Sequence, residues 1–299
     1  MTERSKRWLK RTGITAAFCL GVGVGISVYL GQQLIAPAPS SVGPPPPELG
    51  ACSFSFASKS GSTIGGWLSE VPDARGSVLL LHGIRSNRRS MADRALFLRE
   101  AGYHTLCIDL QAHGESPGDH ITLGFLESKD VAAGIAFLRE HHPDLPVAVL
   151  GTSLGGGSAL MVAPEAQADA LIVESVFSNV ETATANRLEI RFGKAGRLLA
   201  PLLTWQIRPT LGVDPAELSP LAAAARTSPP TFVICGSEDR HARPAESRAI
   251  YSATKGPKEF WAVEGAAHID LHRFAGLAYE RRVTEFLARH LPPPGESAR

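Results

Sequence analysis

The sequence predicts an α/β fold with a mostly parallel central sheet and helices on both of its faces. Short apolar runs of strand length alternate with longer stretches of helical periodicity over most of the chain. Continuous apolar runs of this kind are typical of parallel strands that are buried on both faces. The 299 residues, 44% of them hydrophobic, are enough to bury one large core, so we expect a single folded domain.

The elements are expected in a fixed order along the chain. Residues 54–68, which contain Gly61 and Gly65-Gly66, are expected to form an antiparallel hairpin at the sheet edge. The strands that follow are predicted over residues 77–82, 105–109, 147–151, 170–174, 231–235 and 259–263. The helices are predicted over residues 88–101, 126–141, 154–162, 245–253 and 276–290. Residues 179–229 interrupt this alternation, which predicts a short helical cap inserted after a strand.

The start of the chain differs from the rest in charge and hydropathy. Residues 1–12 are a basic flank, and residues 13–31 are an apolar run without a charged side chain. That run is close to the ~20 residues that a helix needs to cross the hydrocarbon of a membrane. We therefore expect a signal-anchor, a single transmembrane helix that leaves the folded domain extracytoplasmic by the positive-inside rule. The alternative is a cleaved signal sequence and a secreted or periplasmic domain, since Ala36-Pro37-Ala38 matches a cleavage pattern.

Proline-rich residues 32–50 are expected to form an extended, semi-rigid linker. This linker would lead to the folded domain over residues 51–291, with residues 292–299 as a tail. Apart from the basic flank, the chain is slightly acidic. A nucleic-acid partner, which would need a basic face, is therefore not expected.

A serine turn follows the strand predicted over residues 147–151. Gly151-Thr152-Ser153-Leu154-Gly155 matches the Gly-x-Ser-x-Gly pattern, with an apolar strand before it and a helical pattern after it. The glycines are needed because the turn is too tight for a Cβ next to the serine. Such a turn exposes the hydroxyl at the end of the strand, so Ser153 is predicted to be a nucleophile.

A serine nucleophile needs a base, and an acid that orients the base. The acid candidates are Glu238 and Asp239, which follow the next-to-last strand; such a carboxylate could instead cap the helix that begins near Pro244. The base candidate is His268, just after the last strand. The three residue types come in the order serine, acid, histidine, which is the order this kind of serine turn requires.

Two other histidines have competing interpretations. His272 lies four residues after His268, and such a pair could bind a metal. A glutamate between them and a third ligand are missing, so no metal is expected, and His272 is expected on a helix surface. His82 ends a strand and could be a second base, although a role in bracing its loop is favoured. The same loop supplies Ile84, whose backbone N–H is expected to form an oxyanion hole with that of Leu154.

Four separated motifs are similar to those of one superfamily. They are Leu81-His82-Gly83, Asp109-Leu110-Gln111-Ala112-His113-Gly114-Glu115-Ser116, Gly151-Thr152-Ser153-Leu154-Gly155-Gly156, and Gly236-Ser237-Glu238-Asp239 with His268. From about residue 54 to residue 291 the chain resembles the α/β-hydrolases, in particular the serine aminopeptidase-like and monoglyceride-lipase-like branch. The family pattern favours Asp239 over Glu238 as the acid. Gln111 and Ala112 replace the usual Arg-Gly of the second motif, a departure that affects the packing of a structural loop more than the chemistry.

The resemblance implies an α/β-hydrolase fold and a serine hydrolase that cleaves a carboxylic ester or a related acyl bond. Ser153, His268 and Asp239 would form the triad, and the reaction would pass through an acyl-enzyme. No cofactor or metal would be required, and the substrate would be a small-molecule or lipid acyl compound.

The substrate class stays open at this point. Apolar residues of the cap have helix-like spacing and either line an acyl pocket or only pack the cap onto the domain: Phe192, Leu198, Leu199, Leu202, Leu203 and Trp205. A thioesterase or an aminopeptidase-type peptidase could use the same triad. A membrane-tethered binding protein without catalysis is an alternative from another class, because a fold does not determine a function.

Overall fold

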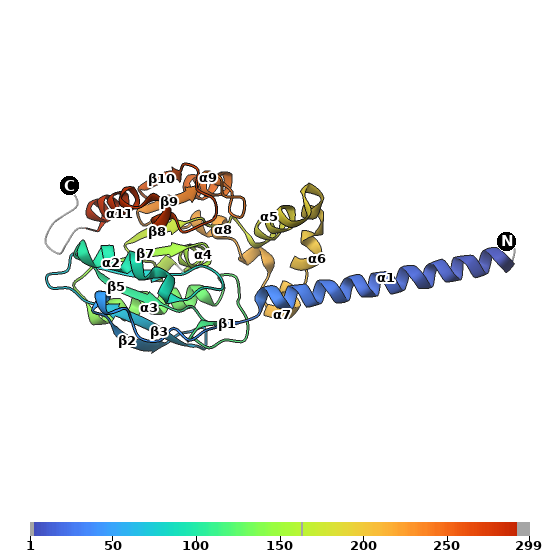
Figure 1. Cartoon of the computed structure of the whole chain (residues 1–299), viewed down its shortest axis with the longest axis horizontal. Helices are drawn as coiled ribbons and strands as arrows, with labels where there is room; N and C mark the ends of the chain where they lie inside the picture. Colours follow the sequence, from blue (N-terminus) through green and yellow to red (C-terminus); the bar gives the residue numbers. More distant parts are fainter. Residues whose placement is uncertain (1–2, 163, 292–299) are drawn as a thin grey trace.

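The computed structural model describes residues 3–162 and 164–291, and its centre is an eight-stranded sheet in the order β10-β9-β8-β7-β4-β5-β3-β2 (Figure 1). An antiparallel hairpin of β2 (Cys52–Ala57) and β3 (Thr63–Ser69) forms one edge. The other strands are parallel: β4 (Ser77–Leu81), β5 (His104–Ile108), β7 (Val147–Thr152), β8 (Ala170–Glu174), β9 (Thr231–Gly236) and β10 (Lys258–Val263). The predicted parallel sheet and its edge hairpin are confirmed.

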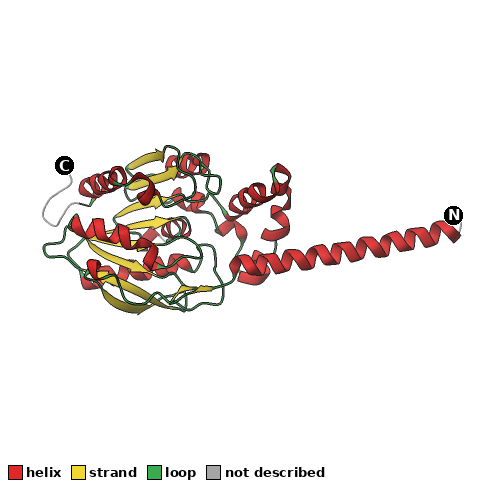
Figure 2. Ribbon diagram, viewed as in Figure 1, coloured by secondary structure: helices red, strands yellow, loops and turns green. Residues whose placement is uncertain are grey.

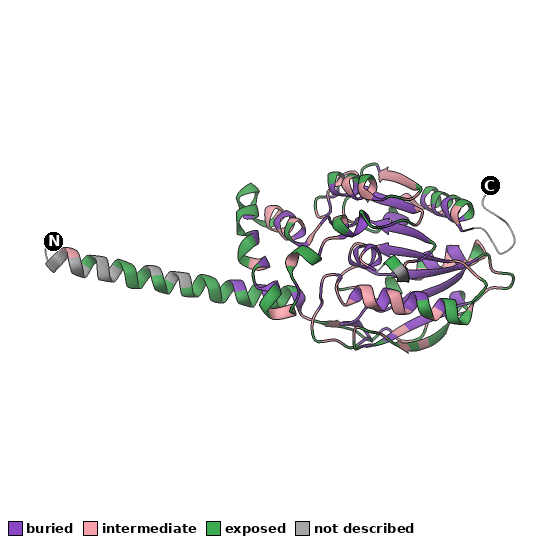
Figure 3. Cartoon of the chain, turned by 180° about the vertical axis from the view of Figure 1, so that it is seen from behind, coloured by how far each residue is buried: buried purple, intermediate pink, exposed green. Residues whose placement is uncertain are grey.

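Helices cover both faces of the sheet (Figure 2). One face packs against α3 (Glu127–His141), α4 (Leu154–Leu160) and α9 (Pro244–Ala253), and the other against α2 (Ala92–Glu100) and α11 (Leu277–His290). Successive residues of a strand point to opposite faces, and both sets of β4 side chains are buried (Figure 3). Burial on both faces explains why these strands are apolar without interruption.

The predicted cap is helical and follows β8. Its helices are α5 (Val180–Phe192), α6 (Ala200–Thr204), α7 (Ile207–Leu211) and α8 (Pro220–Ala224). Helix α5 begins where the side chain of Asn179 accepts a hydrogen bond from the backbone N–H of Thr182 at 2.8 Å. The short helix α10 (Leu271–Ala275), between β10 and α11, was not predicted.

The prediction of a transmembrane helix is wrong. The apolar run lies within helix α1 (Glu3–Ile35), and no helix of the described residues is long and apolar enough to cross a membrane. The last turns of α1 contact the cap, where the side-chain amide of Gln206 donates to the carbonyl of Ser27 at 2.9 Å. A single-pass membrane localisation, the extracytoplasmic placement inferred from it, and the membrane as a partner are therefore not supported.

The proline-rich segment after α1 lies against the domain. Within it, β1 (Ala38–Pro39) pairs in parallel with β6 (His113–Gly114). Val42 and Leu49 are buried. Short 3₁₀ turns occur in this segment and elsewhere, over Pro47–Leu49, Arg88–Met91, Pro164–Ala166, Lys194–Leu199 and Pro215–Glu217. A domain boundary near residue 50 stays a prediction, and the predicted tail over residues 292–299 lies outside the described residues.

A buried ion network joins the sheet to the helices on one face. Nη2 of Arg94, on α2, lies 3.0 Å from Oε2 of Glu174, the last residue of β8, and 2.8 Å from Oδ1 of Asp270. The phenol of Tyr279, on α11, donates a hydrogen bond to the same glutamate. The side chains of Arg94 and Glu174 are each only 2% exposed, so water cannot replace a partner that is removed.

We expect Arg94→Met to lower the free energy of unfolding by about 3–5 kcal/mol, because it leaves Glu174 as an unpaired buried charge. Urea denaturation at neutral pH measures this change. The matched control is Arg139→Met, which breaks an ion pair with Asp169 whose side chains are 42% and 47% exposed, and should cost less than about 1 kcal/mol. Equal losses in the two variants would contradict the importance assigned to the network.

Candidate active site

Ser153 lies at the sharp turn between β7 and α4, where the sequence places it. Its backbone has φ 48° and ψ −109°, a strained conformation for a residue with a side chain. Its N–H donates to the carbonyl of Glu174 on the neighbouring strand at 2.7 Å. This turn holds the hydroxyl beyond the end of the strand, at the mouth of a cavity that Ser153 lines.

The glycines around Ser153 are required by close backbone contacts. A Cβ on Gly151 would lie 2.6 Å from the backbone nitrogen of Gly156. A Cβ on Gly155 would lie 2.7 Å from the carbonyl oxygen of His82. The turn can therefore close, and the loop after β4 can approach it, only because Gly151 and Gly155 have no Cβ.

His268 and Asp239 are hydrogen-bonded to each other. Nδ1 of His268 lies 2.7 Å from Oδ2 of Asp239, whose side chain is fully buried. The other carboxylate oxygen accepts the N–H groups of His241 at 2.8 Å and Ala242 at 2.9 Å. Burial alone would raise the pKa of Asp239, but these hydrogen bonds and the charge of a protonated His268 outweigh it and lower the pKa. Glu238, the other acid candidate, is exposed.

The three predicted triad residues lie at one edge of the sheet. Ser153, Asp239 and His268 follow β7, β9 and β10, and the carboxyl ends of parallel strands share an edge. The loops after β9 and β10 touch, since a Cβ on Gly236 would lie 2.2 Å from the carbonyl oxygen of Ala266. The structure joins Asp239 to His268, but no hydrogen bond is formed between His268 and the hydroxyl of Ser153. Such bonds are often long before substrate binds.

The two predicted oxyanion amides belong to residues beside Ser153. Ile84 and Leu154 line the same cavity as Ser153, and a Cβ on Gly83 would lie 3.6 Å from the Cβ of Ser153. Leu154 is the first residue of α4, so its N–H has no acceptor within the helix. Both residues therefore lie beside Ser153, and the oxyanion hole stays a prediction.

Comparisons with known proteins identify the family and the fold of the chain. A family model described as serine aminopeptidase, S33, matches residues 72–219. YqkD, an uncharacterized protein of Bacillus subtilis (strain 168), is 26% identical over 246 residues, which cover 80% of each chain. The Pyrococcus furiosus esterase Pf2001 is similar in structure with a TM-score of 0.72 and 23% identity, over 86% of this chain and 98% of its own. The acylaminoacyl peptidase of Pyrococcus horikoshii has a TM-score of 0.61 and 18% identity, over 83% of this chain and 43% of its own.

The chain belongs to the α/β-hydrolase superfamily. The predicted superfamily and the prediction of a hydrolase-type enzyme are confirmed by the family match and by the shared fold. At this level the chain is a serine-type α/β-hydrolase, and its substrate is a separate question.

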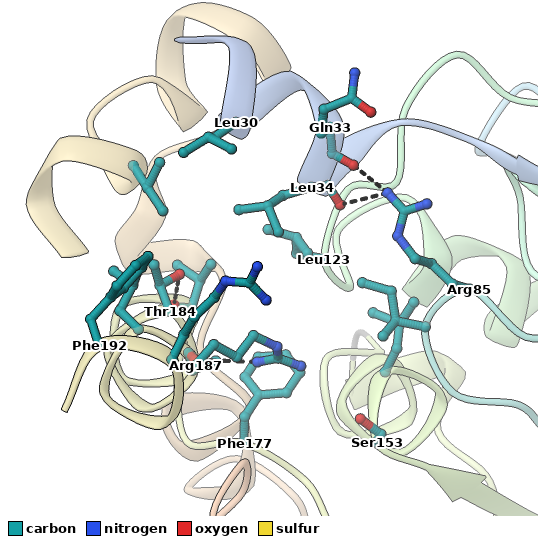
Figure 4. A pocket seen from close by; sticks show the side chains of 17 residues that line it. Leu30, Gln33, Leu34, Arg85, Leu123, Ser153, Phe177, Thr184, Arg187 and Phe192 are labelled. Carbon is teal, nitrogen blue, oxygen red and sulfur yellow. Dashed lines mark hydrogen bonds between the residues drawn. The ribbon is translucent and has the colours of Figure 1, made fainter. Parts of the chain in front are cut away.

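A cavity of about 470 Å³ opens on Ser153 of the hydrolase (Figure 4). This volume is in the range of small-molecule sites. Ile84 and Leu154 line it beside Ser153, α5 of the cap supplies one wall, and the last turns of α1 supply another. Most of the lining side chains are apolar, so the cavity can take a hydrocarbon chain that extends from a carbonyl at Ser153.

Sequence reasoning missed several residues of this cavity. Leu30, at the end of the run that was assigned to a membrane, and Leu34, in the predicted linker, both belong to α1 and line the cavity. Of the apolar cap residues, Phe192 and Leu203 line the cavity, although Phe192 is also 58% exposed. The other four are exposed and do not line it: Leu198, Leu199, Leu202 and Trp205. The apolar stripe of the cap thus serves the cavity only in part.

Two histidines near the site are held by other groups. Nε2 of His272 lies 2.8 Å from Oε1 of Glu280, and the ring is buried against Phe97 and Tyr279, so the expectation of a surface position is wrong. His82 is fully buried; its Nδ1 donates to the carbonyl of Gly83 at 2.7 Å, and its Nε2 accepts from an amide. Both ring nitrogens of His82 are used, which supports a bracing role.

We expect the hydrolase to lose stability as the pH falls below about 6.5. Burial lowers the pKa of His82 to about 3, so over this range the unfolded chain binds a proton that the folded chain does not. The contribution of His82 to the free energy of unfolding is therefore fully present above its pKa in the unfolded chain. It decreases by about 1.4 kcal/mol per pH unit as the pH falls from that value toward the pKa in the folded chain. Urea denaturation at pH 7, 6 and 5 measures the slope. In His82→Gln, unfolding should take up about one proton fewer, so stability should change less steeply between pH 6 and 5 than in the wild type. An unchanged slope would contradict the role assigned to His82.

Proposed function

We propose that the chain is a carboxylic ester hydrolase with Ser153, His268 and Asp239 as its catalytic triad. The observation that carries the proposal is the strained Ser153 turn at the mouth of an apolar cavity, with a hydrogen-bonded Asp239–His268 pair at the same edge of the sheet. A strained backbone of this kind costs about 1–3 kcal/mol, and it is explained here by the position that a serine nucleophile needs.

The proposed reaction has two acyl-transfer steps. Oγ of Ser153 attacks the ester carbonyl while Nε2 of His268 takes its proton, and the tetrahedral intermediate then expels the alcohol, which receives that proton. Water attacks the acyl-enzyme in the same way and releases the acid. Asp239 keeps Nδ1 of His268 protonated, so Nε2 is free to act as the base.

The amides of Ile84 and Leu154 are proposed to stabilise the negative oxygen of each tetrahedral intermediate. A donor of this kind typically contributes about 2.7–4 kcal/mol to the stability of the transition state. Because both donors are backbone groups held by the Ser153 turn and the loop braced by His82, they need no rearrangement when the charge develops.

The cavity favours an ester with an apolar acyl chain over a peptide with a free amino terminus. An aminopeptidase would need a carboxylate for the substrate ammonium group, and no aspartate or glutamate lines the cavity. Glu189, the nearest acid on the cap helix, is paired with Arg197 at 3.0 Å and Arg243 at 2.7 Å. A thioester would fit the same cavity and can be tested with the same acyl chains. The Asp239–His268 pair argues against a binding protein without catalysis, which would not need it.

A fluorophosphonate probe should label the wild-type protein covalently, and Ser153→Ala should abolish the labelling, because the probe reacts with an activated serine. Intact-mass spectrometry measures the added mass. Ser116→Ala is a suitable control, since Ser116 is buried and its hydroxyl donates to the carbonyl of Asp109 at 2.7 Å. A folded wild-type protein that remains unlabelled would refute the proposed nucleophile.

Asp239→Asn and His268→Ala should each lower kcat on 4-nitrophenyl butyrate by roughly 10³–10⁴-fold, since each removes part of the base. Stopped-flow or plate-reader absorbance of nitrophenolate measures the rates. His272→Gln serves as the comparison, because its partner is Glu280 rather than the triad. Loss of turnover in His272→Gln together with retention in His268→Ala would show that the base is His272 and that the proposed assignment to His268 is wrong.

A further inference from the structure

The cavity that opens on Ser153 contains positive charge and no negative charge. Arg85, Arg187 and Arg191 are among its lining residues, and no aspartate, glutamate, lysine or histidine is. An apolar cavity that serves only a hydrocarbon chain has no need for guanidinium groups, which are costly to remove from water. The three arginines therefore need separate explanations.

Arg85 is explained by the fold. Its guanidinium donates to the carbonyls of Gln33 and Leu34, which are among the last carbonyls of α1 and have no partner within the helix (Figure 4). Nη2 of Arg85 thus fixes the end of α1 at the cavity wall, which gives this guanidinium a structural role.

Arg187 and Arg191 are not explained in this way. They lie one turn apart on α5, and like charges at this spacing destabilise a helix slightly. Arg187 is half-buried, whereas Arg191 is exposed, so the cost of removing a guanidinium from water falls on Arg187. The one hydrogen bond of Arg187 is to the carbonyl of Ala183 in its own helix, at 3.2 Å. Among the described residues, no carboxylate lies within ion-pair distance of either guanidinium. In Figure 4 the side chain of Arg187 extends from α5 across the cavity toward Phe177 and Ser153.

The two acids nearest to Arg187 are occupied by other groups. Asp239 binds His268 and two backbone amides. Glu246 accepts hydrogen bonds from the backbone and the hydroxyl of Ser178, both at 2.9 Å, and from the side-chain amide of Asn186 at 2.6 Å. Burial lowers the pKa of Arg187 although both acids favour its charged form. Arg187 therefore remains a cation whose charge is incompletely compensated.

We propose that Arg187, with Arg191 one turn along α5, binds an anionic group carried by the acyl part of the substrate. The preferred substrate class is then a monoester of a dicarboxylic acid. The ester carbonyl would lie at Ser153, and the second carboxyl group would be free. This inference rests on the proposed ester hydrolysis and adds the substrate class to it. A free carboxylate matches the planar fork of a guanidinium, and such charge-assisted pairs are stronger when water is excluded. The apolar residues that make up most of the cavity lining would hold the methylene chain.

Two esters with the same leaving group and chain length test the proposal: mono-4-nitrophenyl suberate, which carries a free carboxylate, and 4-nitrophenyl octanoate, which is neutral. The measured quantity is the ratio of kcat/KM for the charged ester to that for the neutral ester. We expect Arg187→Gln to lower this ratio by roughly tenfold to a hundredfold, and Arg191→Gln by less. Arg187→Lys, which keeps the charge but loses the planar fork, should give an intermediate ratio.

Arg208→Gln is the matched control, because it removes the same charge from an exposed position outside the cavity, where the side chain is 76% exposed. Its ratio should equal that of the wild type. Fluorophosphonate labelling of each variant reports whether its site is folded, and a purely structural effect of Arg187 would change both esters equally. An unchanged ratio in a labelled Arg187→Gln variant would overturn the anion site and leave the proposed ester hydrolysis standing. A wild-type protein that cleaves neither ester and remains unlabelled would overturn the proposed function itself.

Discussion

The strained backbone at Ser153 is the constraint on which the arrangement of the site depends. A residue with a side chain at positive φ is held there only if its surroundings leave no better conformation. Three features do this: β7 lies in the interior of the sheet, Gly151 and Gly155 allow the turn to close, and the N–H of Ser153 binds the carbonyl of Glu174. If any of them were lost, the turn could relax and withdraw the hydroxyl from the cavity.

Glu174 connects this strained turn to the loop of His268. Its carbonyl holds Ser153, while its carboxylate binds Arg94, which also binds Asp270, two residues after His268. The main chain at Ser153 and the main chain two residues after His268 are thus linked through Glu174 and Arg94. A buried ion network is often no more stabilising than apolar packing. Here the network fixes the relative position of two loops. Apolar side chains would do this less well because their contacts are less directional.

The sheet and the chemistry could be predicted from the sequence because both are encoded locally. Apolar strands, the glycines of the serine turn and the residues after each strand are all visible in short windows, and parallel strands bring their carboxyl ends to one edge. The role of α1 could not be predicted in this way. An apolar run has the same composition whether it meets lipid or a protein wall, and only contacts such as Gln206 to Ser27 tell the two apart. The arginines of α5 were missed for a related reason, since a charged residue on a cap helix usually faces water.

The proposed catalytic groups and the walls of the cavity come from different parts of the fold. Ser153, Asp239 and His268 follow strands of the sheet, whereas the far walls of the cavity belong to α5 and to the end of α1. The two parts meet at Arg85, which holds the carbonyls at the end of α1 and directly follows Ile84 in the chain. A displacement of α1 would therefore be transmitted to the backbone amide of Ile84 through Arg85. The N-terminal helix is in this sense a component of the site, because it lines the cavity and contacts the loop that carries the proposed oxyanion donor Ile84.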